Sequence, residues 1–303
     1  MIYQVRHLTT YQYARPVTFA RCALRLNCRS DNEQSVSEAV ITITPRPKAV
    51  KIHTGQFGER VATATIDAPH RELKILATSR VEVRRPAVFD AVFGEAWETV
   101  REAAFAANRI DLDSPAHFLY PTNTTMAVSA ITAYVEASFR PGRPIVQAAF
   151  DLTRRMQADF TYDPEATEVS TLPSVAFSER KGVCQDFAHI MIAGLRALGL
   201  PVGYVSGYLR TKPPPGKPRL AGADATHAWV TLWCGAALGW IGFDPTNGII
   251  VSGDHIILAI GRDYADIAPI GGVILGPGNQ VIKVEVDVVP LSHEANAFQL
   301  SDH

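Results

Sequence analysis

The chain has 303 residues, of which 47% are hydrophobic and 19% are charged, a composition typical of a folded globular protein and unlike that of a disordered one. Its 29 basic and 30 acidic residues leave a net charge of −1 with no basic tract, which argues against nucleic acid as a partner. No run approaches the roughly 20 apolar residues of a membrane span, so we expect no membrane partner.

The first residues and the cysteines indicate a cytoplasmic protein with reduced thiols. Residues 1–7 lack the charged leader and apolar run of a signal peptide. Cys22 and Cys28 stand six positions apart, and an extended strand of that length spans about 20 Å, too far for a disulfide. We therefore expect free cysteines and a cytoplasmic location.

Residues 1–85 show the pattern of β structure. Side chains alternate between the two faces of predicted strands, with turn-forming clusters between them. The clearest of these strands cover residues 3–7, 40–44, 61–65 and 75–83. Short strands with frequent turns predict a sandwich or barrel, and no catalytic residue is evident among them.

After residue 85 the period becomes helical and later returns to that of strands. Helices are predicted over 96–108, 126–139, 145–160 and 184–198, and strands over 202–208, 228–233, 240–243, 256–260, 273–275 and 281–289. The fold class is therefore α+β, in three parts. These are a β-rich N-terminal domain (1–85), a helical connecting segment (86–143) and a catalytic core with the C-terminal strands (144–303), whose helices pack on an antiparallel sheet.

Cys184 is placed where a nucleophile would be expected. It begins a helix whose apolar stripe ends at Gly199, so its sulfur lies at the first turn on the inward side. Cysteines on apolar helix faces are commonly buried core residues. At a helix N-terminus, however, unpaired N–H groups and the macrodipole favour a thiolate and can stabilise an oxyanion.

His227 and Asp244 follow on two successive predicted strands. A hairpin turning symmetrically through Gly235 and Ala236 places them opposite each other, about 5 Å apart at Cβ, and a slip of one pair leaves them diagonal. Separately, each has an ordinary structural interpretation, as a core histidine and as a turn residue before proline. Together with Cys184 they form the Cys-His-Asp set of a thiol acyl-transfer enzyme.

Other candidates are weaker. Gln185 and Trp229 are positioned to orient substrate, although Gln185 is equally suited to be a solvated helix residue. Zinc is the alternative for any Cys/His set, but His189 and Cys234 do not give paired ligand spacing with the triad residues. We therefore expect no metal and no cofactor.

Four segments resemble the bacterial transglutaminase-like family, which has a papain-like core. They are residues 182–189 (GVCQDFAH), 204–208 (YVSGY), 226–230 (THAWV) and 239–247 (GWIGFDPTN). Residues 3–13 resemble the β-rich domain that precedes this core in the family. The resemblance implies Cys184 as nucleophile, His227 as general base and acid, Asp244 as the residue that orients His227, and a thioester acyl-enzyme. Residues 160–163 also match a family segment, which implies Tyr162 as an oxyanion donor.

The expected function is amide or peptide cleavage by a cysteine peptidase or amidase acting on a protein, a peptide or a small amide. Three alternatives stay open: a protein-glutamine transglutaminase with an amine acceptor, an acyltransferase using an activated donor, and a non-catalytic binding module. The proline-rich segment 211–224 is expected to be a loop beside the cleft or a plain surface loop. The sequence does not predict the substrate or the oligomeric state.

Overall fold

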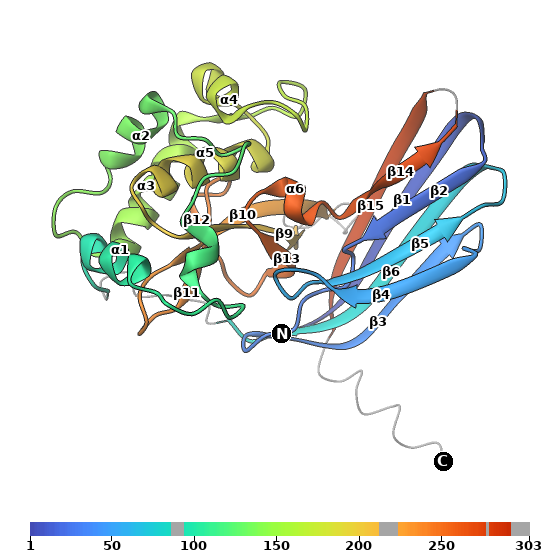
Figure 1. Cartoon of the computed structure of the whole chain (residues 1–303), viewed down its shortest axis with the longest axis horizontal. Helices are drawn as coiled ribbons and strands as arrows, with labels where there is room; N and C mark the ends of the chain where they lie inside the picture. The colour runs from blue at the N-terminus through green and yellow to red at the C-terminus, as the bar shows by residue number, and fades with distance from the viewer. Residues whose placement is uncertain (86–93, 212–223, 277–278, 292–303) are drawn as a thin grey trace, which may run out of the picture.

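The computed structural model describes residues 1–85, 94–211, 224–276 and 279–291. In these ranges the chain forms a strand-rich sandwich beside an α+β core (Figure 1). None of the helices in these ranges combines the length and the apolar character that a membrane crossing requires. Segment 211–224 lies outside the described residues except at its two ends.

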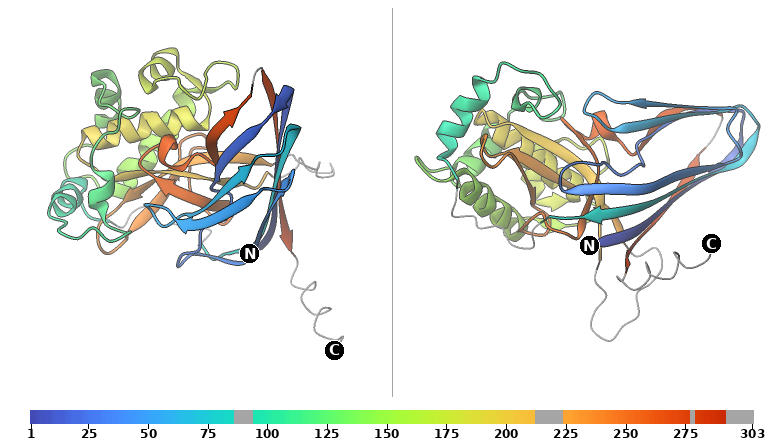
Figure 2. Two further views of the ribbon diagram at one scale, coloured as in Figure 1. Left: turned by 45° about the vertical axis from the view of Figure 1, so that its right-hand side comes forward. Right: turned by 90° about the horizontal axis from the view of Figure 1, so that it is seen from below.

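Two four-stranded sheets make up the sandwich, with strand orders β15-β1-β6-β3 and β14-β2-β5-β4. Figure 2 shows them as separate layers. The strands are β1 (Ile2–Val17), β2 (Phe19–Leu24), β3 (Gln34–Thr44), β4 (Ala49–Thr54), β5 (Arg60–Ile66), β6 (His70–Val83), β14 (Ile270–Leu275) and β15 (Gln280–Leu291). Buried and more exposed side chains alternate along most of β6, as the sequence pattern predicts. Leu73, Ile75 and Ala77 are buried between the two layers, whereas Val81 and Val83 pack toward the core.

The last two strands are placed differently from the expected division of the chain. Their place in the sequence, directly after the core, predicts that β14 and β15 belong to the core. Instead β15 pairs with β1 from Ile2↔Leu291 to Tyr13↔Gln280, and β14 pairs with β2. The chain therefore builds most of the sandwich, passes through the core and returns to complete both sandwich sheets.

The core consists of helices packed on a five-stranded antiparallel sheet of order β12-β11-β10-β9-β13, which confirms the α+β class. Its helices are α1 (Trp97–Phe105), the 3₁₀ helix η1 (Pro115–Phe118), α2 (Ser129–Glu136), α3 (Ile145–Asp159), α4 (Pro173–Glu179), α5 (Cys184–Ala197) and α6 (Tyr264–Ile267). Its strands are β7 (Thr161–Tyr162), β8 (Lys181–Gly182), β9 (Val202–Leu209), β10 (Ala225–Trp233), β11 (Trp240–Asp244), β12 (Ile249–Ile250) and β13 (His255–Gly261).

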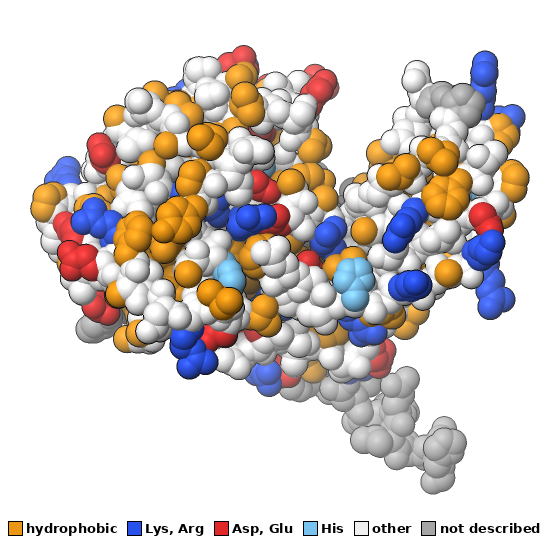
Figure 3. All heavy atoms as spheres, in the orientation of Figure 1, with side chains coloured by type: hydrophobic (Ala, Val, Ile, Leu, Met, Phe, Trp, Pro, Cys, Tyr) orange, Lys and Arg blue, Asp and Glu red, His pale blue; other side chains and the backbone are white. Residues whose placement is uncertain are grey.

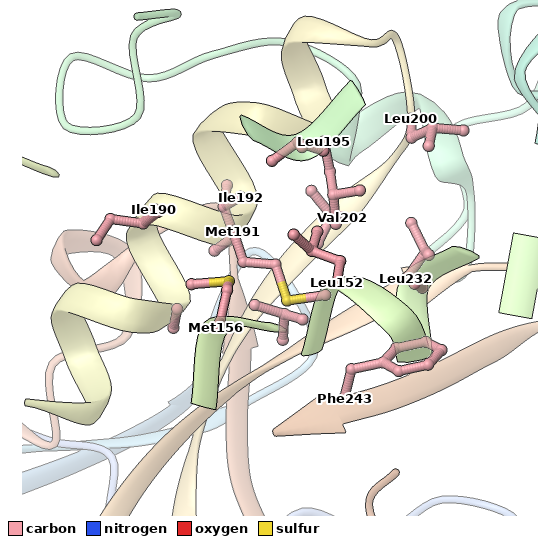
Figure 4. Close-up of a cluster of buried hydrophobic side chains, with 14 of the residues drawn as sticks. Leu152, Met156, Ile190, Met191, Ile192, Leu195, Leu200, Val202, Leu232 and Phe243 are labelled. Atoms are coloured by element: carbon pink, nitrogen blue, oxygen red, sulfur yellow. The ribbon is translucent and has the colours of Figure 1, made fainter. Parts of the chain in front are cut away.

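Helix α5 is the central helix of the core. Figure 4 shows Met191 and Leu195 on α5 meeting Val202 and Leu232 of the sheet, all of them fully buried. Gly194 allows α2 to pack closely, since a Cβ at this position would lie 2.3 Å from the Val135 side chain. This packing fixes the helix, and with it the position of Cys184 at its first turn.

The sandwich and the core share a buried contact. Tyr208 of β9 and Ile256 of β13 pack in one cluster with Val286 and Val288 of β15. Above this contact the surface is hollowed between the two parts, and α6 lies there (Figures 1 and 3).

Candidate active site

Cys184 is the first residue of α5. The start of this helix is held by the hydrogen bonds of Asp186 and by the backbone conformation of Gly182. Asp186 is buried, and its Oδ2 accepts the backbone N–H of Val183 at 2.8 Å and the hydroxyl of Thr167 at 2.6 Å. Gly182 is required here, because its φ is +153° and a Cβ would lie 2.6 Å from Asp186 Oδ2. The partly buried thiol is thus held beside the helix N–H groups that have no intrahelical partner.

His227 and Asp244 are in contact, although not in the expected register. Val230 pairs with Phe243, so Asp244 lies opposite Trp229 and diagonal to His227. The expected direct pairing is therefore wrong, but diagonal residues share a sheet face. The Nε2 of His227 donates to Asp244 Oδ2 at 2.8 Å, and both residues are buried.

The imidazole of His227 is coupled to the thiol as well as to the carboxylate. Since Nε2 is taken by Asp244, Nδ1 is the nitrogen left for Cys184. Burial alone would lower the pKa of His227, but hydrogen bonds and charge interactions with Asp244 and Cys184 outweigh it and raise the pKa to about 10. The buried Asp244 carboxylate therefore favours the positively charged form of His227.

The Asp244 carboxylate is fully buried and surrounded by hydrogen-bond donors. Oδ1 accepts the backbone N–H groups of Thr246 and Asn247, and Oδ2 accepts Asn247 Nδ2 at 2.7 Å and His255 Nε2 at 3.1 Å. Burial would raise the pKa of Asp244, but the histidines hold it well below its ordinary range. The carboxylate is therefore a fixed anion.

Sequence reasoning missed two of these donors. Asn247 belongs to the 239–247 motif, which could have identified it as a neighbour of Asp244. His255 carried no such signal, since it lies outside every motif and on another strand.

The three secondary candidates have different environments. Tyr162 pairs through its backbone with Gly182, its side chain is half exposed, and burial and the charge of Cys184 raise its pKa. Trp229 is buried, and its ring lies 6.0 Å from that of His227. Gln185 instead donates to the carbonyl of Val169 at 2.9 Å, which ties down a neighbouring loop and favours its structural interpretation.

The two other residues considered as zinc ligands, Cys234 and His189, have ordinary structural environments. Cys234 is buried in the apolar core cluster, and His189 Nε2 accepts the backbone N–H of Tyr264 at 3.2 Å. His227, Asp244 and His255 do form a possible ligand set, with candidate atoms within 4.8 Å of one another. Their ligand atoms are already matched as hydrogen-bond donors and acceptor, so the cluster needs no ion to be satisfied.

Comparisons with known families cover most of the chain. Residues 3–82 match the bacterial transglutaminase-like N-terminal region, and residues 122–245 match the transglutaminase-like superfamily. These two regions correspond to the first six sandwich strands and to the core from before α2 to the end of β11.

Whole-length relatives are also found. The chain is 38% identical to the uncharacterized protein Rv2569c of Mycobacterium tuberculosis (strain ATCC 25618 / H37Rv) over 300 residues, 97% of this chain and 94% of that protein. It is 30% identical to the uncharacterized protein ML0607 of Mycobacterium leprae (strain TN), over 95% and 99% of the two chains. The crystal structure of a putative cysteine protease from Cytophaga hutchinsonii has the same fold, with a TM-score of 0.74, 19% identity and coverage of 96% and 92%.

Fold and comparisons together define a protein with a papain-like core joined to an N-terminal strand-rich region. The chain belongs to the transglutaminase-like superfamily.

Proposed function

We propose that the protein is a thiol-dependent acyl-transfer enzyme that cleaves amide or peptide bonds, with Cys184, His227 and Asp244 as its triad. The observation that carries this proposal is the two-sided coupling of His227, to the carboxylate through Nε2 and to the thiol of Cys184. A core histidine can satisfy both ring nitrogens with neutral groups, as His7 does with two hydroxyls. An imidazole between a buried anion and a helix-terminal thiol is the arrangement that activates a nucleophile.

In the proposed reaction His227 takes the thiol proton, and the Cys184 sulfur attacks the carbonyl carbon. The backbone N–H of Cys184 donates to the resulting oxyanion, and Tyr162 is the proposed second donor. His227 then gives its proton to the nitrogen as the C–N bond breaks, which releases an amine and leaves a thioester. Water attacks the thioester with His227 as base, so that the acid product leaves and the thiol is restored.

We propose hydrolysis rather than transamidation, because water is always present and an amine acceptor requires a site of its own. An amine would resolve the same thioester with the same residues. Incubation of acyl-enzyme with a primary amine separates these outcomes: hydrolysis predicts free acid as the main product, whereas amide formation at low amine concentration would establish transamidation. The cytoplasmic location and a protein, peptide or small-amide substrate stay proposals.

The proposal is tested first by alkylation. Iodoacetamide labelling of Cys184 is followed by mass spectrometry as a function of pH, in wild type and in His227→Ala. Rapid labelling well below pH 8.5, where an unperturbed thiol titrates, is expected in wild type and should be lost in the variant. Slow labelling with the same rate in wild type and in His227→Ala would refute an activated thiol and favour the binding-module alternative. Cys234, buried in the core, is the internal control for unfolding.

A further inference from the structure

His255 reaches the site from a strand that is not a neighbour of the strand that carries Asp244. It begins β13, whereas Asp244 ends β11, and two strands, β10 and β9, separate these elements in the sheet. Three strand spacings would span about 14 Å in a flat sheet. Yet His255 Nε2 lies 3.1 Å from Asp244 Oδ2. The side chains of His255 and Asp244 therefore extend toward each other across the sheet and meet beside the triad.

The hydrogen bonds of His255 define its tautomer. Its Nδ1 accepts the backbone N–H of Ser252 at 3.5 Å, so the ring proton is on Nε2 and is donated to Asp244 Oδ2. The side chain is completely buried. Burial lowers the pKa of His255 more than the neighbouring Asp244 raises it, which favours a neutral donor rather than a second imidazolium.

One neighbour packs on this ring and another fixes the backbone that carries it. The Trp229 ring meets it edge-on at 5.1 Å between centroids, and Arg85 Nη1 donates to the His255 carbonyl at 2.7 Å. Trp229 also lies against His227. The ring thus has little freedom to leave Asp244, and its orientation is linked to the packing of the triad histidine.

We propose that His255 is a positioning residue for the triad. By donating to Oδ2, the oxygen that also accepts from His227, it holds the carboxylate in orientation and shares its negative charge. Because part of the negative charge of Asp244 is directed to His255, the carboxylate stabilises the protonated form of His227 less strongly. The imidazolium can therefore still release its proton to the leaving amine. This role rests on the proposed function of the triad.

A purely structural role would have a different signature. A buried histidine that only fills space affects stability and leaves the titration of His227 unchanged. A positioning residue changes that titration, because an Oδ2 that loses a donor becomes more basic and binds the imidazolium proton more tightly. In the part of the chain that the structure describes, the charged or titratable groups that act on His255 are Asp244 on β11, His227 on β10, and Arg85 in the segment after β6.

The test uses two variants that differ in one hydrogen bond. In His255→Gln the amide nitrogen replaces Nε2 and can still donate to Asp244. In His255→Asn the shorter amide can keep the bond to Ser252 but cannot reach Asp244. His7→Gln is the control, because His7 is also buried but bonds only to the hydroxyls of Tyr208 and Thr9, both at 2.9 Å.

The measured quantity is the pH profile of Cys184 alkylation by iodoacetate, in a buffer with a chelator that removes metal ions. Iodoacetate is an anion, so it reacts faster while His227 is positively charged, and the upper limb of the profile reports loss of that charge. We expect His255→Asn to move the upper limb to higher pH by about one unit, roughly the effect of one charge-assisted hydrogen bond. His255→Gln and His7→Gln should keep the wild-type profile.

Each outcome is decisive. An unchanged profile in a folded His255→Asn protein would overturn the positioning role and leave the proposed function intact, whereas a wild type without rapid labelling would refute the proposed function itself. If His255→Asn does not fold, His255→Met takes its place, because its flexible apolar side chain fills the space and has no donor for Asp244. An upper limb displaced to higher pH then supports the positioning role, and an unchanged upper limb overturns it.

Discussion

At the scale of single residues, the charge of Asp244 should determine a pH-dependent part of the stability. Folding lowers the pKa of Asp244 from 3.8, so its contribution is present above that pH and is lost in acid. Folding raises the pKa of His227 from 6.5 to about 10, so its contribution is complete below 6.5 and is lost as the pH approaches 10. Both contributions are therefore present between pH 3.8 and 6.5.

Asp244→Asn should consequently lower the free energy of unfolding by about 3 kcal/mol in this window, because it leaves buried donors without their anion. Urea unfolding of wild type and variant across pH measures the difference, which should shrink toward both extremes. A difference that stays constant with pH would show that packing, and not the ion pair, determines the loss. The variant should also lose rapid alkylation of Cys184.

The same residues show how far the sequence could predict the site. Cys184, His227 and Asp244 were recognisable because each belongs to a contiguous motif, and the structure brings them together. Their catalytic roles remain a proposal. His255 lies 11 positions from Asp244, at no spacing that a local pattern predicts, and the two meet only in the folded sheet. The predicted register between β10 and β11 was wrong by one pair. His227 and Asp244 are nevertheless in contact, because alternate residues of a strand share one face.

At the scale of elements, the start of α5 should depend on Asp186. This residue caps the Val183 N–H and holds Thr167 of the preceding loop. Asp186→Ala should therefore cost about 1 kcal/mol of stability and slow the alkylation of Cys184, because the first turn loses its anchor. Thermal unfolding and iodoacetamide labelling measure the two effects.

Gln185→Ala is the matched control for that prediction. It removes a solvent-exposed hydrogen bond to Val169 from the same helical turn, so we expect a stability change within about 0.5 kcal/mol and an unaltered alkylation rate. If Gln185→Ala slowed labelling as much as Asp186→Ala, the loop rather than the cap would be what positions the thiol.

Helices with a clear apolar periodicity were predicted more accurately than short helices. The helices expected at 145–160 and 184–198 correspond to α3 and α5, whose apolar side chains recur over several turns. The seven-residue helix α4 was not predicted, because two turns are too short to establish a period. The late strands were predicted as strands but not with their partners, since periodicity contains no information on which sheet a strand joins.

At the scale of the whole molecule, the path of the chain makes the sandwich and the core depend on each other. Val288 of β15 is completely buried in the cluster that contains Tyr208 and Ile256 of the core, whereas its neighbour Val289 is 38% exposed. A charge at 288 would thus lie in the contact between the two parts, and a charge at 289 would face solvent.

Val288→Asp should therefore destabilise the entire protein by about 3 kcal/mol or more, because an unpaired carboxylate would be buried, and Val289→Asp should change stability by no more than about 0.5 kcal/mol. The unfolding of the sandwich can be followed by the alkylation of buried Cys22, and that of the core by the alkylation of buried Cys234. In Val288→Asp both transitions should move together to lower urea concentration. Separate transitions, with only the sandwich signal displaced, would contradict this prediction. They would mean that the core folds independently of β14 and β15.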